Sequence, residues 1–192
     1  MLRPAQFRSA ILSVGVLLVF LLVGFFGSSG SFDRGASSAE SAPVAGMRRV
    51  GLRPGDLAPD FALPSIDGVR VSLSDFRGHS PVLLNLWTVS CPYCHLELDE
   101  LKSMYDDYKG RLTILSVSVD PGYPASYIKQ LAVSKGLPFT VLVDQRLTVA
   151  RLYSVSAVPA NYLIDEDGII LGVFMGVIDR ETMKNKVEPL LQ

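Results

Sequence analysis

A strand that leads directly into a helix through two cysteines constrains the fold of this chain more than any other feature. Residues 82–87 are an apolar run of strand length. Residues 92–109 carry apolar side chains at helical spacing, namely Leu98, Leu101, Met104, Tyr105 and Tyr108. Cys91 and Cys94, the only cysteines of the chain, lie where the strand gives way to the helix. A Cys-x-x-Cys motif inside an α/β pattern predicts a redox-active disulfide.

The start of a helix suits thiol chemistry. The first helical turn lowers the pKa of a thiol, because its free N–H groups and the positive end of the helix dipole stabilise a thiolate. Pro92 suits the first helical position, where its missing N–H is not needed. We therefore expect Cys91 to be the attacking nucleophile and Cys94, one turn further in, to be the resolving thiol. Beyond this disulfide no cofactor or metal is expected, because the chain has no second cysteine pair and only His79 and His95 as histidines.

The residues around the motif resemble the ResA/TlpA-like thiol–disulfide oxidoreductases of the thioredoxin superfamily, which are related to the AhpC/TSA family. The resemblance extends from about Pro54 to the C-terminus. The matching positions are Asn85 and Trp87 before the motif, Glu97 after it, and Val158-Pro159 followed by residues 162–165. The chain departs from the family at Ser90, where the family usually carries Trp. We therefore expect a less apolar mouth of the site.

The order of the predicted elements, together with this resemblance, implies an α/β, thioredoxin-like fold with a central mixed sheet flanked by helices. Two strands around the turn at residues 65–68 predict an N-terminal β-hairpin extension. The predicted strands are 60–63, 69–72, 82–87, 112–119, 140–143, 161–164 and 169–174. The predicted helices are 92–109, 124–135, 147–153 and 180–191, with one helical turn at 73–76.

An apolar segment precedes the folded domain. Residues 10–26 are apolar, and Arg3 and Arg8 before them favour a cytoplasmic N-terminus. The segment is interpreted as an uncleaved membrane-anchor helix in preference to a cleaved signal peptide. We expect a cytoplasmic segment at 1–9, the anchor at 10–26, a flexible linker at 27–50 and the thioredoxin-like domain at 51–192. The domain would then face the periplasm or another extracytoplasmic space.

Val158-Pro159 stands where the superfamily places a cis-proline opposite the cysteines. The resemblance therefore implies a cis bond, and backbone that could pair with the extended chain of a substrate. Trp87, packed beside the disulfide or simply part of the core, and Tyr93 in the motif are the other candidate substrate-binding residues.

Glu97 lies three residues after Cys94, among leucines. A carboxylate near apolar groups has a raised pKa and could exchange protons with Cys94, although the same spacing fits a solvated helix residue. The resemblance implies a functional Glu here, so Glu97 is a candidate catalytic residue. Asn85 replaces the buried Asp of thioredoxins. His95 lies four residues after Cys91, so it either stabilises the thiolate or is simply exposed. With Pro92, these two residues are expected to tune the pKa of the thiols.

The resemblance implies a thiol–disulfide oxidoreductase that reduces protein disulfides, with apocytochrome c in cytochrome c maturation as a candidate substrate and a membrane thiol donor as reductant. A net charge of −1 gives no reason to expect nucleic acid as a partner. Two alternatives remain open. Thr88-x-x-Cys91 echoes peroxiredoxin-like peroxidases, although Leu84 stands where they carry Pro. A non-enzymatic copper or zinc carrier would use both cysteines and His95.

Overall fold

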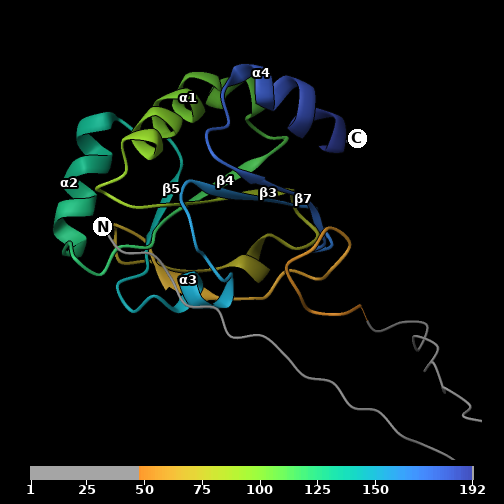
Figure 1. The fold of residues 1–192 in the computed structure, drawn as a ribbon, viewed down its shortest axis with the longest axis horizontal. Helices are drawn as coiled ribbons and strands as arrows, with labels where there is room; N and C mark the ends of the chain where they lie inside the picture. Colours follow the sequence, from red (N-terminus) through yellow and green to blue (C-terminus); the bar gives the residue numbers. More distant parts are fainter. Residues whose placement is uncertain (1–47, 192) are drawn as a thin grey trace, which may run out of the picture. The chain divides into compact units, whose positions relative to one another are not determined.

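A five-stranded mixed sheet forms the centre of the protein, in the strand order β5-β4-β3-β6-β7 (Figure 1). The computed structural model describes residues 48–191, so the predicted cytoplasmic segment and anchor lie outside the described residues. The strands are β3 (Val82–Trp87), β4 (Thr113–Ser118), β5 (Thr140–Val143), β6 (Ala160–Ile164) and β7 (Ile170–Met175). β3, β4 and β5 are parallel, β6 pairs antiparallel with β3, and β7 pairs antiparallel with β6. The predicted thioredoxin-like mixed sheet is confirmed.

Helices cover both faces of the sheet because its central strand is apolar on both sides. Every residue of β3 is buried, with Leu83 and Trp87 on one face and Leu84 and Leu86 on the other. The helices are α1 (Pro92–Tyr108), α2 (Ala125–Lys135), α3 (Thr148–Leu152) and α4 (Arg180–Thr182). α1, α2 and the C-terminal helical segment pack on the first face, and α3 packs on the second.

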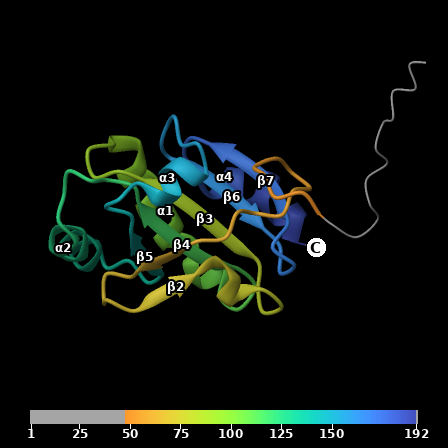
Figure 2. The same ribbon diagram turned by 90° about the horizontal axis from the view of Figure 1, so that it is seen from below.

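A two-stranded hairpin, β1 (Ala62–Pro64) and β2 (Arg70–Ser72), accompanies α3 on the second face (Figure 2). A bridge between Ser65 and Leu142 attaches the hairpin to β5. The short helix η1 (Leu73–Phe76) follows, capped by Ser72 and Asp75. The hairpin leaves the opposite face free for α1.

The C-terminal segment is less regular than predicted. After α4 it continues as a π-helical turn, η2 (Met183–Val187), and a 3₁₀ turn, η3 (Glu188–Leu191). Pro189 has no N–H for an α-helical hydrogen bond, so one uniform α-helix over residues 180–191 is wrong. α3 also starts one residue later than expected, because Leu147 adopts a left-handed conformation with φ of 54°.

Within the described residues, the end of the predicted linker contacts the domain. Arg49 pairs with Asp56 through two hydrogen bonds of 3.1 Å, and its carbonyl oxygen accepts the N–H of Leu57 at 2.9 Å. The last residues assigned to the linker therefore contact the domain. No helix within residues 48–191 is long and apolar enough to cross a membrane.

Candidate active site

The two cysteines form a disulfide at the point where α1 begins. Cys91 is the N-cap of α1, and its Sγ accepts the N–H of Cys94 at 3.1 Å. Pro92 occupies the first turn, where no N–H is needed. Cys94 is fully buried, whereas Cys91 is only partly buried. This difference in exposure supports Cys91 as the sulfur that a substrate reaches first.

The loop before β6 faces this disulfide. The Val158–Pro159 peptide bond is cis, as expected. The carbonyl oxygen of Val158 lies 3.7 Å from Cys91 Sγ. The Pro159 carbonyl oxygen accepts the N–H of Gly176 at 2.9 Å, which ties the loop to the end of β7. A backbone acceptor is therefore fixed directly beside the reactive sulfur.

Glu97 is fully buried on the same face of α1 as Cys94. Three N–H groups donate to its carboxylate: Asn85 Nδ2 to Oε2 at 2.6 Å, Asn161 Nδ2 to Oε1 at 2.8 Å and the Ile178 amide to Oε1 at 2.8 Å. Burial raises the pKa of Glu97 from 4.5 to about 7, and these three hydrogen bonds oppose the rise. A group with this pKa can both accept and donate a proton near neutral pH.

Asn85, a predicted site residue, belongs to a row of polar residues beneath Glu97 whose other two members, Ser116 and Asn161, were missed by sequence reasoning. Asn85 lies in register with Ser116 on β4 and with Asn161 on β6. Asn85 donates to Asn161 Oδ1 at 3.0 Å and accepts from Ser116 Oγ at 3.0 Å, and all three residues are fully buried. Ser116 and Asn161 are polar residues inside otherwise apolar strands, and that is the signal that could have identified them.

The other predicted site residues have different surroundings. Tyr93 is 70% exposed beside the disulfide, where a partner can reach it. Trp87 is fully buried in the core cluster that contains Cys94. A substrate-binding surface at Trp87 is therefore wrong, because α1 and its neighbours cover this end of β3. His95 donates Nε2–H to the Val89 carbonyl at 2.7 Å, and its ring packs edgewise against Trp87.

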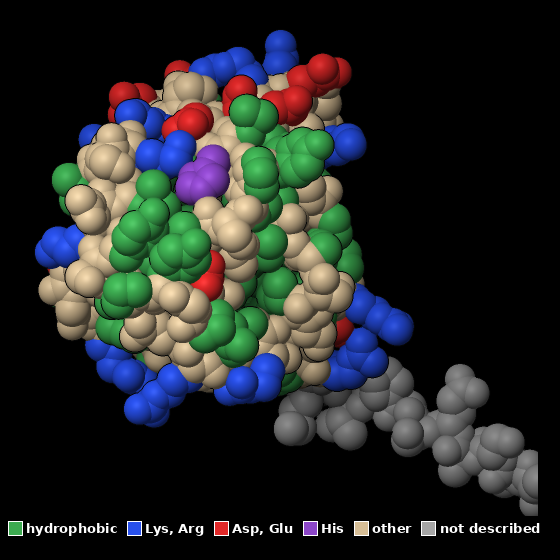
Figure 3. All heavy atoms as spheres, turned by 60° about the vertical axis from the view of Figure 1, so that its left-hand side comes forward, with side chains coloured by type: hydrophobic (Ala, Val, Ile, Leu, Met, Phe, Trp, Pro, Cys, Tyr) green, Lys and Arg blue, Asp and Glu red, His purple; other side chains and the backbone are tan. Residues whose placement is uncertain are grey.

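An apolar groove of about 250 Å³ is lined in part by Val158, whose carbonyl oxygen lies beside Cys91 Sγ. Its lining residues are Thr88, Val119, Leu147, Ala150 and residues 155–158. A larger cavity of about 490 Å³ lies between the hairpin and the loop after β5, and it shares no residue with the active site. The end of the sheet where β3 leads into α1 comes forward in Figure 3, and hydrophobic side chains gather near the centre of that face.

Within residues 48–191, no three His, Cys, Asp or Glu side chains converge to hold a metal ion.

Comparison with known proteins identifies the family. The model of the AhpC/TSA family matches residues 54–173. The chain belongs to this family. The thiol-disulfide oxidoreductase ResA of Geobacillus thermodenitrificans (strain NG80-2) is 32% identical over 137 residues, which are 71% of this chain and 77% of the relative. The thioredoxin-like protein YneN of Bacillus subtilis (strain 168) is 29% identical over 142 residues, covering 73% and 82%.

Solved structures agree with this assignment. A protein from Chlorobium tepidum, described as thiol:disulfide interchange protein DsbE, superimposes with a TM-score of 0.66 at 31% identity, covering 74% of this chain and 100% of that one. The peroxidoxin BcpB of Mycobacterium tuberculosis has a TM-score of 0.63 at 22% identity over 73% of this chain and 97% of that one, which shows the fold alone. The protein is a thiol–disulfide oxidoreductase of the ResA/DsbE type. The resemblance seen in the sequence is confirmed.

Proposed function

We propose that this enzyme works as a reductase of disulfides in exported proteins, with apocytochrome c as a candidate substrate. The observation that carries the proposal is the buried Glu97 carboxylate, with a pKa of about 7, one helical turn after Cys94. A reductase must deprotonate its resolving thiol while that thiol is shielded from water, and Cys94 is fully buried. Glu97 supplies a base in that shielded position.

The reaction follows from the exposures of the two sulfurs. The Cys91 thiolate attacks one substrate sulfur, a mixed disulfide forms, and the other substrate sulfur leaves as a thiolate that takes a proton from water. Glu97 then accepts the proton of the Cys94 thiol, and the Cys94 thiolate attacks Cys91 Sγ. This step forms the Cys91–Cys94 disulfide and releases the second substrate sulfur. Two electrons pass from the enzyme to the substrate, so a dithiol donor must reduce the enzyme again.

Substrate binding is assigned to the backbone at Val158 and to the adjoining groove. The Val158 carbonyl is available to accept an N–H from an extended substrate chain, and apolar side chains of that chain would occupy the groove. Ala150→Phe fills the groove and should raise KM for a protein substrate more than it slows reaction with a small disulfide. Equal effects on both substrates would remove the groove from the proposal.

Two measurements test the assignment of roles and the direction of electron flow. Cys94→Ser should accumulate a mixed disulfide between Cys91 and the substrate, whereas Cys91→Ser should trap none. An equilibrium potential of the Cys91–Cys94 pair near that of thioredoxin, about −270 mV, supports a reductase. A potential near about −120 mV, as in DsbA, would mean that the enzyme donates disulfides.

The proposed place of work is the extracytoplasmic side of the cell membrane, tethered through residues 10–26, with a membrane thiol donor as the reductant. The apolar segment after Arg3 and Arg8 supports this proposal. Protease should digest the thioredoxin-like domain when it is added to cells whose outer envelope has been permeabilised but whose inner membrane is intact. Protection from protease until the inner membrane is lysed would place the domain in the cytoplasm.

The alternatives give different results in simple assays. A peroxidase turns over hydrogen peroxide catalytically, whereas a dithiol reductase consumes at most one equivalent per Cys91–Cys94 pair. A copper carrier binds Cu(I) through both reduced thiolates with submicromolar affinity.

A further inference from the structure

The loop that carries Cys91 is held by hydrogen bonds from two neighbouring elements. Residues 88–90 connect the end of β3 to Cys91. The Trp87 carbonyl accepts the N–H of Val119 at 2.9 Å, and the Thr88 carbonyl accepts the N–H of Cys91 at 3.3 Å. The peptide groups between them, at Val89, are bound by two side chains from elsewhere in the chain.

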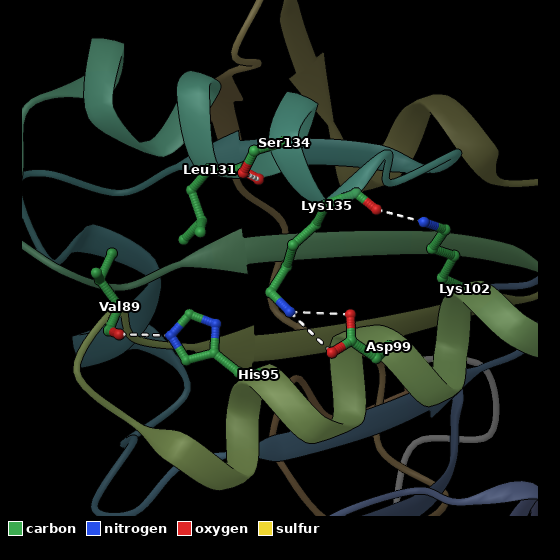
Figure 4. A network of polar contacts seen from close by, with 7 residues as sticks. All are labelled: Val89, His95, Asp99, Lys102, Leu131, Ser134 and Lys135. Carbon is green, nitrogen blue, oxygen red and sulfur yellow. Dashed lines mark hydrogen bonds and ion pairs between the residues drawn. The ribbon is translucent and has the colours of Figure 1, made fainter.

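Asp120 and His95 bind the two polar groups of the Val89 backbone. The Val89 N–H donates to Asp120 Oδ2 at 3.1 Å. The Val89 carbonyl accepts His95 Nε2–H at 2.7 Å, as Figure 4 shows. Asp120 follows β4 and is 8% exposed, and its Oδ1 accepts the N–H of Gly122 at 3.0 Å. Val89 is also 8% exposed, and its bond to Asp120 is buried, whereas its bond to His95 is partly buried.

We propose that Asp120 is a positioning residue for Cys91 and acts through the Val89 peptide group. Val89 lies two residues before Cys91, whose Sγ must stay 3.1 Å from the Cys94 N–H and 3.7 Å from the Val158 carbonyl. The first-turn N–H stabilises a thiolate only if the sulfur keeps this alignment. Asp120 thereby sets the thiol pKa and the reactivity of Cys91. The proposal holds for either direction of electron flow.

The charged groups near the loop include an ion pair on its α1 side. One turn beyond His95 on α1, Asp99 forms an ion pair of 2.9 Å with Lys135 of α2 (Figure 4). Asp120 binds the Val89 N–H itself. Removing only the negative charge of Asp120 would lower the pKa of Cys91, because a nearby anion opposes a thiolate. Removing its hydrogen bond should raise that pKa, so the two effects have opposite signs and can be separated.

Asp120→Ala and Asp120→Asn in the reduced full-length protein make this separation. The pKa of Cys91 is read from the pH profile of its alkylation, and its reactivity from the rate with a small disulfide. Asp120→Asn loses only the charge, and its amide oxygen can still accept the Val89 N–H, so the pKa of Cys91 should be at or below the wild-type value and the rate should be close to that of wild type. Asp120→Ala loses both the charge and the hydrogen bond, so its Cys91 pKa should lie above that of Asp120→Asn and its reaction should be about tenfold slower. A Cys91 pKa in Asp120→Ala at or below that of Asp120→Asn overturns the proposal.

Asp165→Ala is the matched control. Asp165 Oδ1 likewise accepts two backbone N–H groups, from Asp167 and Ile169, but it follows Ile164, which pairs with Val82 at the other end of β3. The Asp165→Ala variant should have a lower free energy of unfolding than wild type, but its Cys91 pKa should be unchanged. An equal pKa change in both alanine variants would indicate a general loss of structure and overturn the proposal.

His95 provides a second test if Asp120→Ala fails to fold. His95→Ala releases the Val89 carbonyl, whereas His95→Gln keeps a neutral N–H donor near it. Positioning through Val89 predicts that Gln restores the Cys91 rate and Ala does not. If Gln behaves like Ala, the imidazolium charge acts directly on the thiolate, and positioning through Val89 is refuted.

Discussion

The buried carboxylate of Glu97 makes the stability of this protein depend on pH in a specific window. Its pKa is 4.5 when exposed and about 7 in the fold, chiefly because burial disfavours the charged form. A raised pKa in the folded state means that the folded protein binds more protons than the unfolded chain between these two values. Stability is therefore fully present below pH 4.5 and is lost as pH rises through about 7. At about 1.4 kcal/mol per unit of pKa, the loss amounts to about 3 kcal/mol.

Glu97→Gln removes this titration. The free energy of unfolding of wild type minus that of the variant should fall by about 3 kcal/mol between pH 4.5 and pH 8 and then become constant. Urea titrations of the oxidised protein measure it at each pH. Trp87 is the only tryptophan and is buried in the core cluster with Cys94, so its fluorescence reports unfolding without a label.

The same variant separates this linkage from a general loss of stability. In Glu97→Gln, the amide N–H of the new side chain faces the N–H donors that bind the Glu97 carboxylate in wild type. The variant should therefore also be less stable than wild type by an amount that does not depend on pH. Glu181→Gln, at an exposed carboxylate on α4, is the control for the Glu-to-Gln change itself. A flat difference curve for Glu97→Gln would refute a raised pKa at Glu97 and with it the proton transfer to Cys94.

Three further substitutions probe the surroundings of the site. Asn161→Ala removes one donor to Glu97, so the pKa of Glu97 should rise and the midpoint of the difference curve should move to higher pH; an unmoved midpoint contradicts this. Tyr153→Phe removes the 2.8 Å bond to the Pro59 carbonyl, and urea unfolding should show a loss of about 1 kcal/mol with disulfide exchange unchanged. Met104→Ala empties a fully buried position on α1 and should cost about 2–5 kcal/mol; a loss below 1 kcal/mol would mean that the core repacks.

The strand, the cysteine motif and the helix that follows it were predictable because local sequence determines them. The limits of β3 agree with the prediction, and α1 ends one residue earlier than predicted. Pro92, the apolar strand and the helical spacing all act over a few residues, and they specify the same elements that packing then stabilises. The C-terminal segment was less predictable, because Pro189 interrupts a pattern whose apolar spacing is otherwise helical.

The environment of Glu97 could not be derived from its own helix. Spacing fits a buried or a solvated Glu equally well, and only the resemblance favoured a functional one. Two of its three donors come from Asn161 and Ile178, which lie 64 and 81 residues away in sequence. Such contacts depend on the register between β3 and β6 and on the loop after β7. The substrate-binding role predicted for Trp87 failed for the same reason. Its burial depends on how α1 packs on β3, which the local sequence does not reveal.

The register of three strands explains why an amide at position 85 suits an acid at position 97. Asn85 donates one N–H to Glu97 and the other to Asn161, and its oxygen accepts from Ser116. Together with Asn161 and Ile178 it surrounds the carboxylate with donors, which favours the anion, while burial favours the neutral acid. Because the hydrogen bonds oppose the effect of burial, the pKa of Glu97 is about 7 and not higher still. A carboxylate at position 85 would instead place two acids in contact and favour protonation of one of them. The amide keeps Glu97 as the titrating group of this cluster, in the pH range where it can exchange a proton with Cys94.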